Sequence, residues 1–215
     1  MKLPTKTQVA SLDVDAQYTF TPRCPDELPV PGGDEIAEEL NRQSTFAAWR
    51  LGSKDAHSPQ AEWVCTDKDP AYSPIEGKNM DIRWPPHAVP GTKGFELLAG
   101  LPHPSDYDFF VWKGVEPDMH PYGACYHDLQ QRMSTGLIEF LESKQVSTVL
   151  VGGLATDYCV RHTVEQLLNA GFSVVVNRAA IRGVADESSR HAMAEMIQMG
   201  AIFVTNSAAL EQTDA

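Results

Sequence analysis

The chain has 215 residues, 42% of them hydrophobic, and a formal net charge of −12, which suits one α/β domain over residues 1–215. The acidic balance and the lack of clustered Lys and Arg argue against nucleic acid or an anionic membrane as a partner. No apolar run approaches transmembrane length, and the N-terminus lacks a signal-peptide core. We therefore expect a cytoplasmic protein that acts on a small molecule. The sequence leaves open whether it forms a homo-oligomer.

Apolar runs of strand character alternate along the chain with segments of helical periodicity. This alternation predicts a doubly wound parallel sheet with helices on both faces. The expected helices cover 34–43, 129–143, 157–170 and 187–199, with Asp34 and Asp186 as N-caps of the first and last. The expected strands cover 9–15, 46–53, 107–113, 146–151, 172–176 and 201–205. Residues 56–106 lack periodicity, and loops of that length are usually functional.

Polar residues follow four of the expected strands. Asp15 ends the first strand, Asp55 and His57 follow the second, Lys113 ends the third and Cys159 follows the fourth. Ligands of open parallel sheets bind beyond the carboxyl ends of the strands, so these residues are candidates for one site. The four cysteines are widely spaced without a CxxC pair, which argues against a disulfide framework or zinc ribbon.

Cys159 is the candidate nucleophile. Glycines break the apolar run that precedes it, and the chain then enters the first turn of a helix. The positive end of a helix dipole lowers a thiol's pKa and favours the reactive thiolate. The alternative is a buried core cysteine, since free cysteines are among the most buried residues.

Asp15 is the candidate proton acceptor for this thiol. Its flanks are apolar, and partial burial raises a carboxyl pKa. Asp13 competes with it, because both would face the same side of a strand, and a turn cap is the alternative role. Lys113 would stabilise the carboxylate and the thiolate if it lies beside them; otherwise it is an exposed strand-end lysine.

An Asp-x-His pair, Asp55 and His57, together with the downstream His87, forms a candidate metal site. Carboxylate and imidazole ligands suit Zn, Fe or Mn. Glu62 and Asp81 in the same loop are candidate additional ligands, or else solvated acids. The remaining histidines have no comparable context and are interpreted as surface or packing residues: His103, His120, His127, His162 and His191.

Two aromatic residues accompany these groups. Phe20 follows the first strand and Trp84 precedes His87. Such rings could clamp a flat heteroaromatic substrate by offset stacking, or they could simply cover the core.

In these motifs the chain resembles the nicotinamidases of the isochorismatase-like cysteine hydrolase superfamily. The resemblance covers nearly the whole chain and rests on the segments 14–17 with Phe20, 55–57 with 84–87, 111–114, and 153–160. The acid, lysine and cysteine mark the superfamily, and the metal motifs mark the nicotinamidases.

The resemblance implies a six-stranded parallel sheet and hydrolysis of nicotinamide to nicotinate and ammonia through a cysteine thioester. It implies one divalent ion, zinc first and iron or manganese as alternatives, held by Asp55, His57 and His87 and bound to the pyridine nitrogen. It also implies a cis peptide between Ala155 and Thr156, and an oxyanion hole from the backbone N–H groups of Ala155 and Cys159. Tyr122 and Tyr126 would line the pocket.

Three other functions compete with this interpretation. The first is a metal-independent amidase of the same superfamily acting on a carbamoyl or other small amide. The second is a binding protein that has lost turnover, and the third is a redox-sensing thiol protein. The presence of Asp15, Lys113 and Cys159 together argues against the second.

Overall fold

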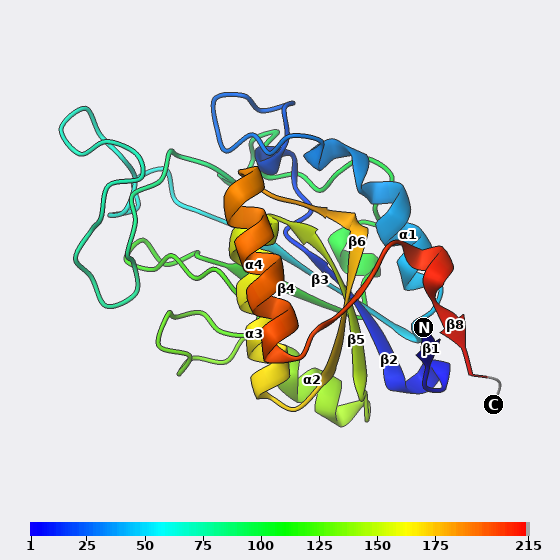
Figure 1. The fold of residues 1–215 in the computed structure, drawn as a ribbon. Helices are drawn as coiled ribbons and strands as arrows, with labels where there is room; N and C mark the ends of the chain where they lie inside the picture. Colours follow the sequence, from blue (N-terminus) through cyan, green and yellow to red (C-terminus); the bar gives the residue numbers. More distant parts are fainter. Residues whose placement is uncertain (214–215) are drawn as a thin grey trace.

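A sheet of six parallel strands forms the centre of the computed structural model, which describes residues 1–213 (Figure 1). Its strand order is β4-β3-β2-β5-β6-β7, and every neighbouring pair runs parallel. The strands are β2 (Val9–Val14), β3 (Trp49–Asp55), β4 (Phe109–Lys113), β5 (Thr148–Leu154), β6 (Ser173–Arg182) and β7 (Ile202–Val204). The predicted six-stranded parallel sheet is therefore confirmed. Two short strands that no sequence pattern predicts, β1 (Lys2–Leu3) and β8 (Glu211–Gln212), pair with each other.

Helices cover both faces of this sheet. One face packs against α2 (Leu137–Ser143), α3 (Arg161–Asn169) and α4 (Asp186–Met199), and the other against α1 (Ala37–Ser44). The α1 side chain of Gln43 donates to Ser11 Oγ in β2, on the face opposite to Leu12. None of the helices within residues 1–213 is long and apolar enough to cross a membrane.

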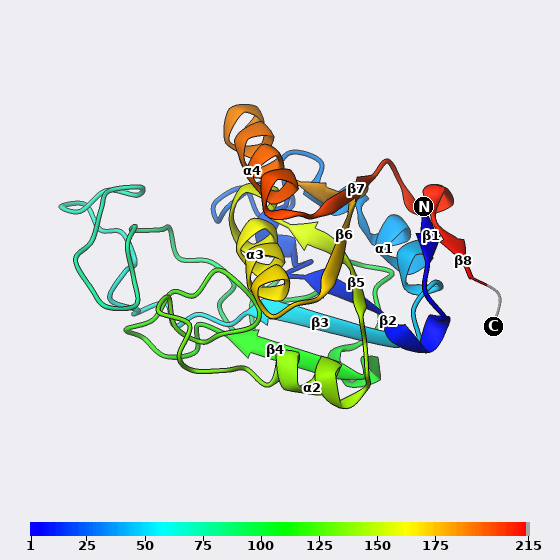
Figure 2. The same cartoon turned by 60° about the horizontal axis from the view of Figure 1, so that its bottom comes forward.

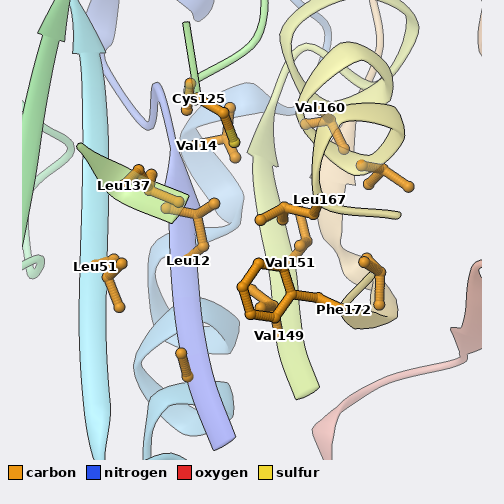
Figure 3. Packing of buried hydrophobic residues seen from close by; sticks show 14 of the residues in the cluster. Leu12, Val14, Leu51, Cys125, Leu137, Val149, Val151, Val160, Leu167 and Phe172 are labelled. Carbon is orange, nitrogen blue, oxygen red and sulfur yellow. The ribbon is translucent and has the colours of Figure 1, made fainter. Parts of the chain in front are cut away.

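The larger core lies between the sheet and α2, α3 and α4. Leu12, Val149 and Val151 contribute the strand side of this layer, and Leu137 and Leu167 contribute the helix side (Figure 3). All five side chains are completely buried, and each such burial stabilises the fold by about 1.5–3 kcal/mol. The same alternation that buries Leu12 turns Asp13 to the other face of β2.

Local signals place several helix ends wrongly. The helix expected from residue 129 begins at Leu137, because Asp128 Oδ1 accepts the backbone N–H groups of Arg132 and Met133 and holds that segment in turns. Asp34 does not cap α1 and instead pairs with Arg23.

The start of α4 is also capped differently from the prediction. Asp186 lies inside the helix rather than at its N-cap. The Asp157 carboxylate instead accepts hydrogen bonds at this terminus. The donors are the backbone N–H groups of Val184 and Ala185 and the hydroxyl of Ser188. A cap supplied from a distant segment leaves no local sequence pattern.

Gly153 allows β2 and β5 to pair where both strands end. It is the partner of Val14, its φ is +133°, and an added Cβ would meet the Val14 carbonyl oxygen at 1.9 Å. We expect Gly153→Ala to lower the free energy of unfolding by about 3–5 kcal/mol, from strain and overpacking together. Gly171→Ala is the matched control, because its φ is +92° with no heavy atom within 4 Å, and about 1 kcal/mol is expected. Equal losses in urea denaturation would contradict the role given to the Val14 contact.

Candidate active site

The strand order brings the candidate catalytic residues to one edge of the sheet. The order reverses between β2 and β5, so the chain departs to opposite sides there and leaves a crevice. Asp15 follows β2, Asp55 ends β3, Lys113 ends β4, and Cys159 follows β5. The arrowheads of β3 and β4 point toward the long loop between them (Figure 2).

Lys113 is the centre of this group and is fully buried. Its Nζ lies 2.9 Å from Asp15 Oδ2 and 3.6 Å from Cys159 Sγ, and it forms a second ion pair with Asp55. Burial lowers the pKa of Lys113, but Asp15 and Asp55 raise it more, so the pKa lies well above its ordinary value. The structure therefore brings the three predicted catalytic residues together around a permanent cation.

Geometry separates Asp15 from its competitor Asp13. Asp15 lies beyond the end of β2 with φ +44°, and it accepts a hydrogen bond of 2.7 Å from Ser53 Oγ. Asp13 instead lies 2.7 Å from Arg50 Nη2 and accepts from the Tyr107 hydroxyl at 2.9 Å. A left-handed backbone at an Asp is tolerated but uncommon, and here it accompanies a change in side-chain direction.

The surroundings of Cys159 disfavour the thiolate that its place at a helix start was expected to favour. It lies in a π-helical turn, Thr156–Val160, that leads into α3. Burial raises the pKa of Cys159 well above its ordinary value, and Lys113 only partly offsets this. Burial also raises the pKa of Asp15, although Lys113 opposes it. The thiol therefore needs a base, and Asp15 is within 4.8 Å of it.

Three buried imidazoles form a cluster beside this group. Nitrogens of His57, His87 and His120 lie within 4.8 Å of one another, and Asp55 Oδ2 lies 3.5 Å from His57 Nε2. His57 and His87 were predicted, whereas His120 was interpreted as a packing or surface residue. No motif surrounds His120 in the sequence, and only the path of the chain after β4 brings it here.

The cluster fits the chemistry of a metal site. The Nδ1 atoms of His57 and His87 lie 2.9 and 2.8 Å from the carbonyl oxygens of Gly114 and Pro85, to which only an N–H can donate. In the neutral tautomer that donates from Nδ1, the Nε2 atom of each ring carries the lone pair that a metal needs, and Nε2 of His57 is buried without a hydrogen-bond partner among the described residues.

The charges of the clustered side chains also fit a metal site. Burial and then His57 lower the pKa of His87 to about 3, and the same causes hold the pKa of His120 well below its usual range. Burial raises the pKa of Asp55, but Lys113 and then His57 outweigh it, so this group stays a carboxylate. Neutral imidazoles and a carboxylate are ligands that divalent transition metals prefer.

The two acids suggested as additional ligands lie outside the cluster. Glu62 is exposed, and the exposed Asp81 accepts a hydrogen bond of 2.7 Å from the Tyr122 hydroxyl. Neither belongs to the group of nitrogen and oxygen atoms that converge around His57.

A small cavity opens onto the thiol and the imidazoles. Its walls are largely aromatic and include Phe20, Trp84, Tyr122 and Tyr158, together with Ala155, Cys159, His87 and His120. Tyr158 was not predicted, although its place next to Cys159 could have suggested it. Tyr126 does not line this cavity; it packs against the larger core and pairs with Ser134.

The turn before Cys159 differs in one detail from the expectation. The cis peptide joins Leu154 and Ala155, not Ala155 and Thr156. It therefore lies where β5 ends, one residue earlier than the resemblance implied. Ala155 and Cys159 both line the cavity, and the oxyanion role of their N–H groups stays a prediction.

His162 makes stability depend on pH. Its ring stacks on Tyr122 at 5.1 Å, and burial, followed by Arg161, lowers its pKa to about 4. The unfolded chain binds this proton near pH 6.5, so folding stability is full above that pH and falls as pH drops toward 4. Its side chain is 33% exposed, so we expect about 1–2 kcal/mol from this residue. Denaturation of His162→Phe should show a shallower loss between pH 6.5 and 4, and an identical slope would contradict this.

Comparisons with known proteins agree with this geometry. Residues 60–208 match the isochorismatase domain family. The nicotinamidase of Escherichia coli is 31% identical over 205 residues, which cover 91% of this chain and 94% of that protein. PnC1 from L. infantum, solved in complex with nicotinate, has a TM-score of 0.83 at 26% identity and covers 99% of this chain and 100% of its own. A pyrazinamidase of Pyrococcus horikoshii, solved in complex with zinc, has a TM-score of 0.72 at 28% identity and covers 92% and 98%.

Proposed function

The chain belongs to the isochorismatase family, and we propose that within it this protein is a nicotinamidase, hydrolysing nicotinamide to nicotinate and ammonia. One observation carries the proposal: Cys159, which is buried beside Lys113 and Asp15, lines an aromatic cavity whose walls also include His87 and His120. The nicotinamidase relatives and the nicotinate-bound neighbour support the choice of substrate.

The first half of the reaction forms a thioester. Asp15 takes the proton of the Cys159 thiol, and the sulfur attacks the carboxamide carbon. Negative charge develops on the amide oxygen, where the backbone N–H groups of Ala155 and Cys159 would donate to it. The C–N bond then breaks, and the proton held by Asp15 leaves with the nitrogen as ammonia. Lys113 keeps Asp15 oriented and balances the negative charge of the site.

The second half releases the acid. Asp15, again a carboxylate, takes a proton from water, and the resulting hydroxide attacks the thioester carbon. The C–S bond breaks, the sulfur recovers the proton from Asp15, and nicotinate leaves. Water is consumed once, and the proton of the carboxylic acid passes to the ammonia, so the balance is nicotinamide plus water giving nicotinate plus ammonium.

Recognition of the ring uses the opposite side of the cavity. Phe20 and Trp84 would hold the pyridine ring between them by stacking. Asp55, His57 and His87 would hold one divalent ion, zinc in first place since a structural neighbour carries it, with iron or manganese as alternatives. Bound there, the ion would supply a Lewis acid for the pyridine nitrogen. The proposal places the protein in cytoplasmic salvage of pyridine nucleotides.

Ammonia release from nicotinamide by the zinc-loaded protein tests the proposal, with Cys159→Ala as the blank. We expect steady turnover that falls after chelation and returns when metal is restored. A panel of carbamoyl and aliphatic amides runs beside it. Turnover of that panel without turnover of nicotinamide would overturn the proposed substrate and favour a different small-amide hydrolase, and inertness toward every amide would favour a binding protein.

A further inference from the structure

The third imidazole of the cluster has no role in the reaction described above. His120 lies in the segment that follows β4, seven residues after Lys113, and its side chain is only 4% exposed. Both of its ring nitrogens are buried without a hydrogen-bond partner among the described residues. Buried polar groups in folded proteins nearly always have a partner, so these two nitrogens call for one that the protein itself does not supply.

The surroundings of His120 orient its ring toward the other two histidines. The ring lies nearly parallel to that of His57, with centroids 5.0 Å apart and an interplanar angle of 20°, and the Trp63 ring lies at 75° to it with centroids 4.4 Å apart. Its backbone N–H donates to the Asn79 carbonyl at 2.7 Å, which ties this segment to the long loop. The ring is therefore fixed within reach of the His57 and His87 nitrogens.

We propose that His120 is a protein ligand of the metal, so that three imidazoles and the Asp55 carboxylate hold one divalent ion. The inference rests on the metal-dependent function proposed above and deepens it. The long loop does not provide this ligand, because Glu62 is exposed and its neighbour Trp63 turns an apolar ring to the cluster. The segment after β4 provides it instead.

A packing role for His120 explains the structure less well. Packing would use the faces of the ring and leave two buried nitrogens unpaired, which is costly. Contact with substrate could satisfy one nitrogen, and only while the cavity is filled. A metal ion satisfies one nitrogen permanently and explains why three rings converge with their nitrogens within 4.8 Å.

Metal affinity measured without substrate tests this inference. Zinc binding to wild type, His120→Phe and His103→Phe is measured by competition with a chromophoric chelator, and the Co²⁺-substituted proteins are compared by visible absorption. Phenylalanine keeps the stacked ring and removes the ligand. Mutating a residue that only hydrogen-bonds to a metal ligand typically lowers metal affinity or activity by about 10–100-fold. Loss of a ligand itself should cost more, so we expect His120→Phe to weaken zinc binding by on the order of 100-fold or more and to alter the Co²⁺ absorption bands. His103 is exposed, so its variant should match wild type.

X-ray absorption of the zinc-loaded wild type does not depend on any variant folding. Three imidazoles in the first coordination sphere would support the inference, and two would overturn it. Unchanged zinc affinity and an unchanged Co²⁺ spectrum in folded His120→Phe would overturn it as well. These readouts are independent of the substrate: a wild type that binds zinc through His120 but leaves nicotinamide intact would contradict the proposed function alone.

Discussion

Lys113→Met is expected to lower the free energy of unfolding of the metal-free protein by about 3–5 kcal/mol and to abolish measurable turnover. The lysine is the only cation between Asp15 and Asp55 within the described structure, and both carboxylates are buried. Removing one partner of a buried ion pair leaves an uncompensated charge, which costs far more than the pair contributes. Urea denaturation measures the first effect and ammonia release the second.

Lys54→Met provides the control for this change. Lys54 precedes Asp55 on β3 and is also largely buried, but it faces the other way, with its Nζ 3.4 Å from the centroid of the Phe95 ring. No carboxylate of residues 1–213 lies within 4 Å of this ammonium, and burial lowers the Lys54 pKa to about 8. Loss of the cation–π contact should cost about 1 kcal/mol or less and leave turnover intact. Equal destabilisation by the two variants would contradict the special role of Lys113.

Asp15→Asn is expected to reduce kcat by about 10²–10⁴-fold, the usual contribution of a general base. Asparagine has nearly the same shape and can still accept from Ser53, so KM and zinc content should change little. Steady-state kinetics at fixed pH separate the two parameters. A rise in KM together with a fall in kcat and lost zinc would instead indicate that the site had collapsed.

Asp13→Asn is the matched change two residues earlier on β2. It weakens the contacts with Arg50 and Tyr107 and should lower the free energy of unfolding by about 1–3 kcal/mol. Because Asp13 faces away from Cys159, kcat should stay near wild type. A loss of kcat as large as that of Asp15→Asn would show that the two acids are not separated in function.

The strands and the candidate catalytic residues at their ends were predictable because each depends on local signals. The apolar runs of β2 and β5 are dense enough to identify buried strands, and a parallel sheet necessarily gathers residues that follow its strands at one edge. Asp15, Lys113 and Cys159 were therefore found as a group. Strand alternation alone left Asp13 open, the resemblance over residues 14–17 favoured Asp15, and in the structure the positive φ of Asp15 separates the two acids.

Other features depend on contacts between distant segments and could not be predicted. The capping of α4 by Asp157 and the approach of His120 to His57 both join parts of the chain that lack any shared motif. The predicted direction of the Cys159 pKa shift was wrong because burial raises this pKa more than Lys113 lowers it, and burial is set by the whole fold. Tyr126 fell outside the cavity for the same reason, since its neighbours are core residues.

Two different parts of the fold carry the candidate site residues: the sheet and the loop that joins β3 to β4. Lys113 ends β4, Asp15 directly follows β2, and Cys159 lies in the turn that joins β5 to α3, so the sheet and this turn fix their mutual spacing. Trp84 and His87 belong to the loop, which between residues 56 and 103 contains neither a helix nor an extended strand. If the proposed function holds, a change of loop sequence would alter which amide is admitted while Asp15, Lys113 and Cys159 keep their mutual geometry. Selection for a new substrate would therefore act first on the loop and leave the residues held by the sheet unchanged.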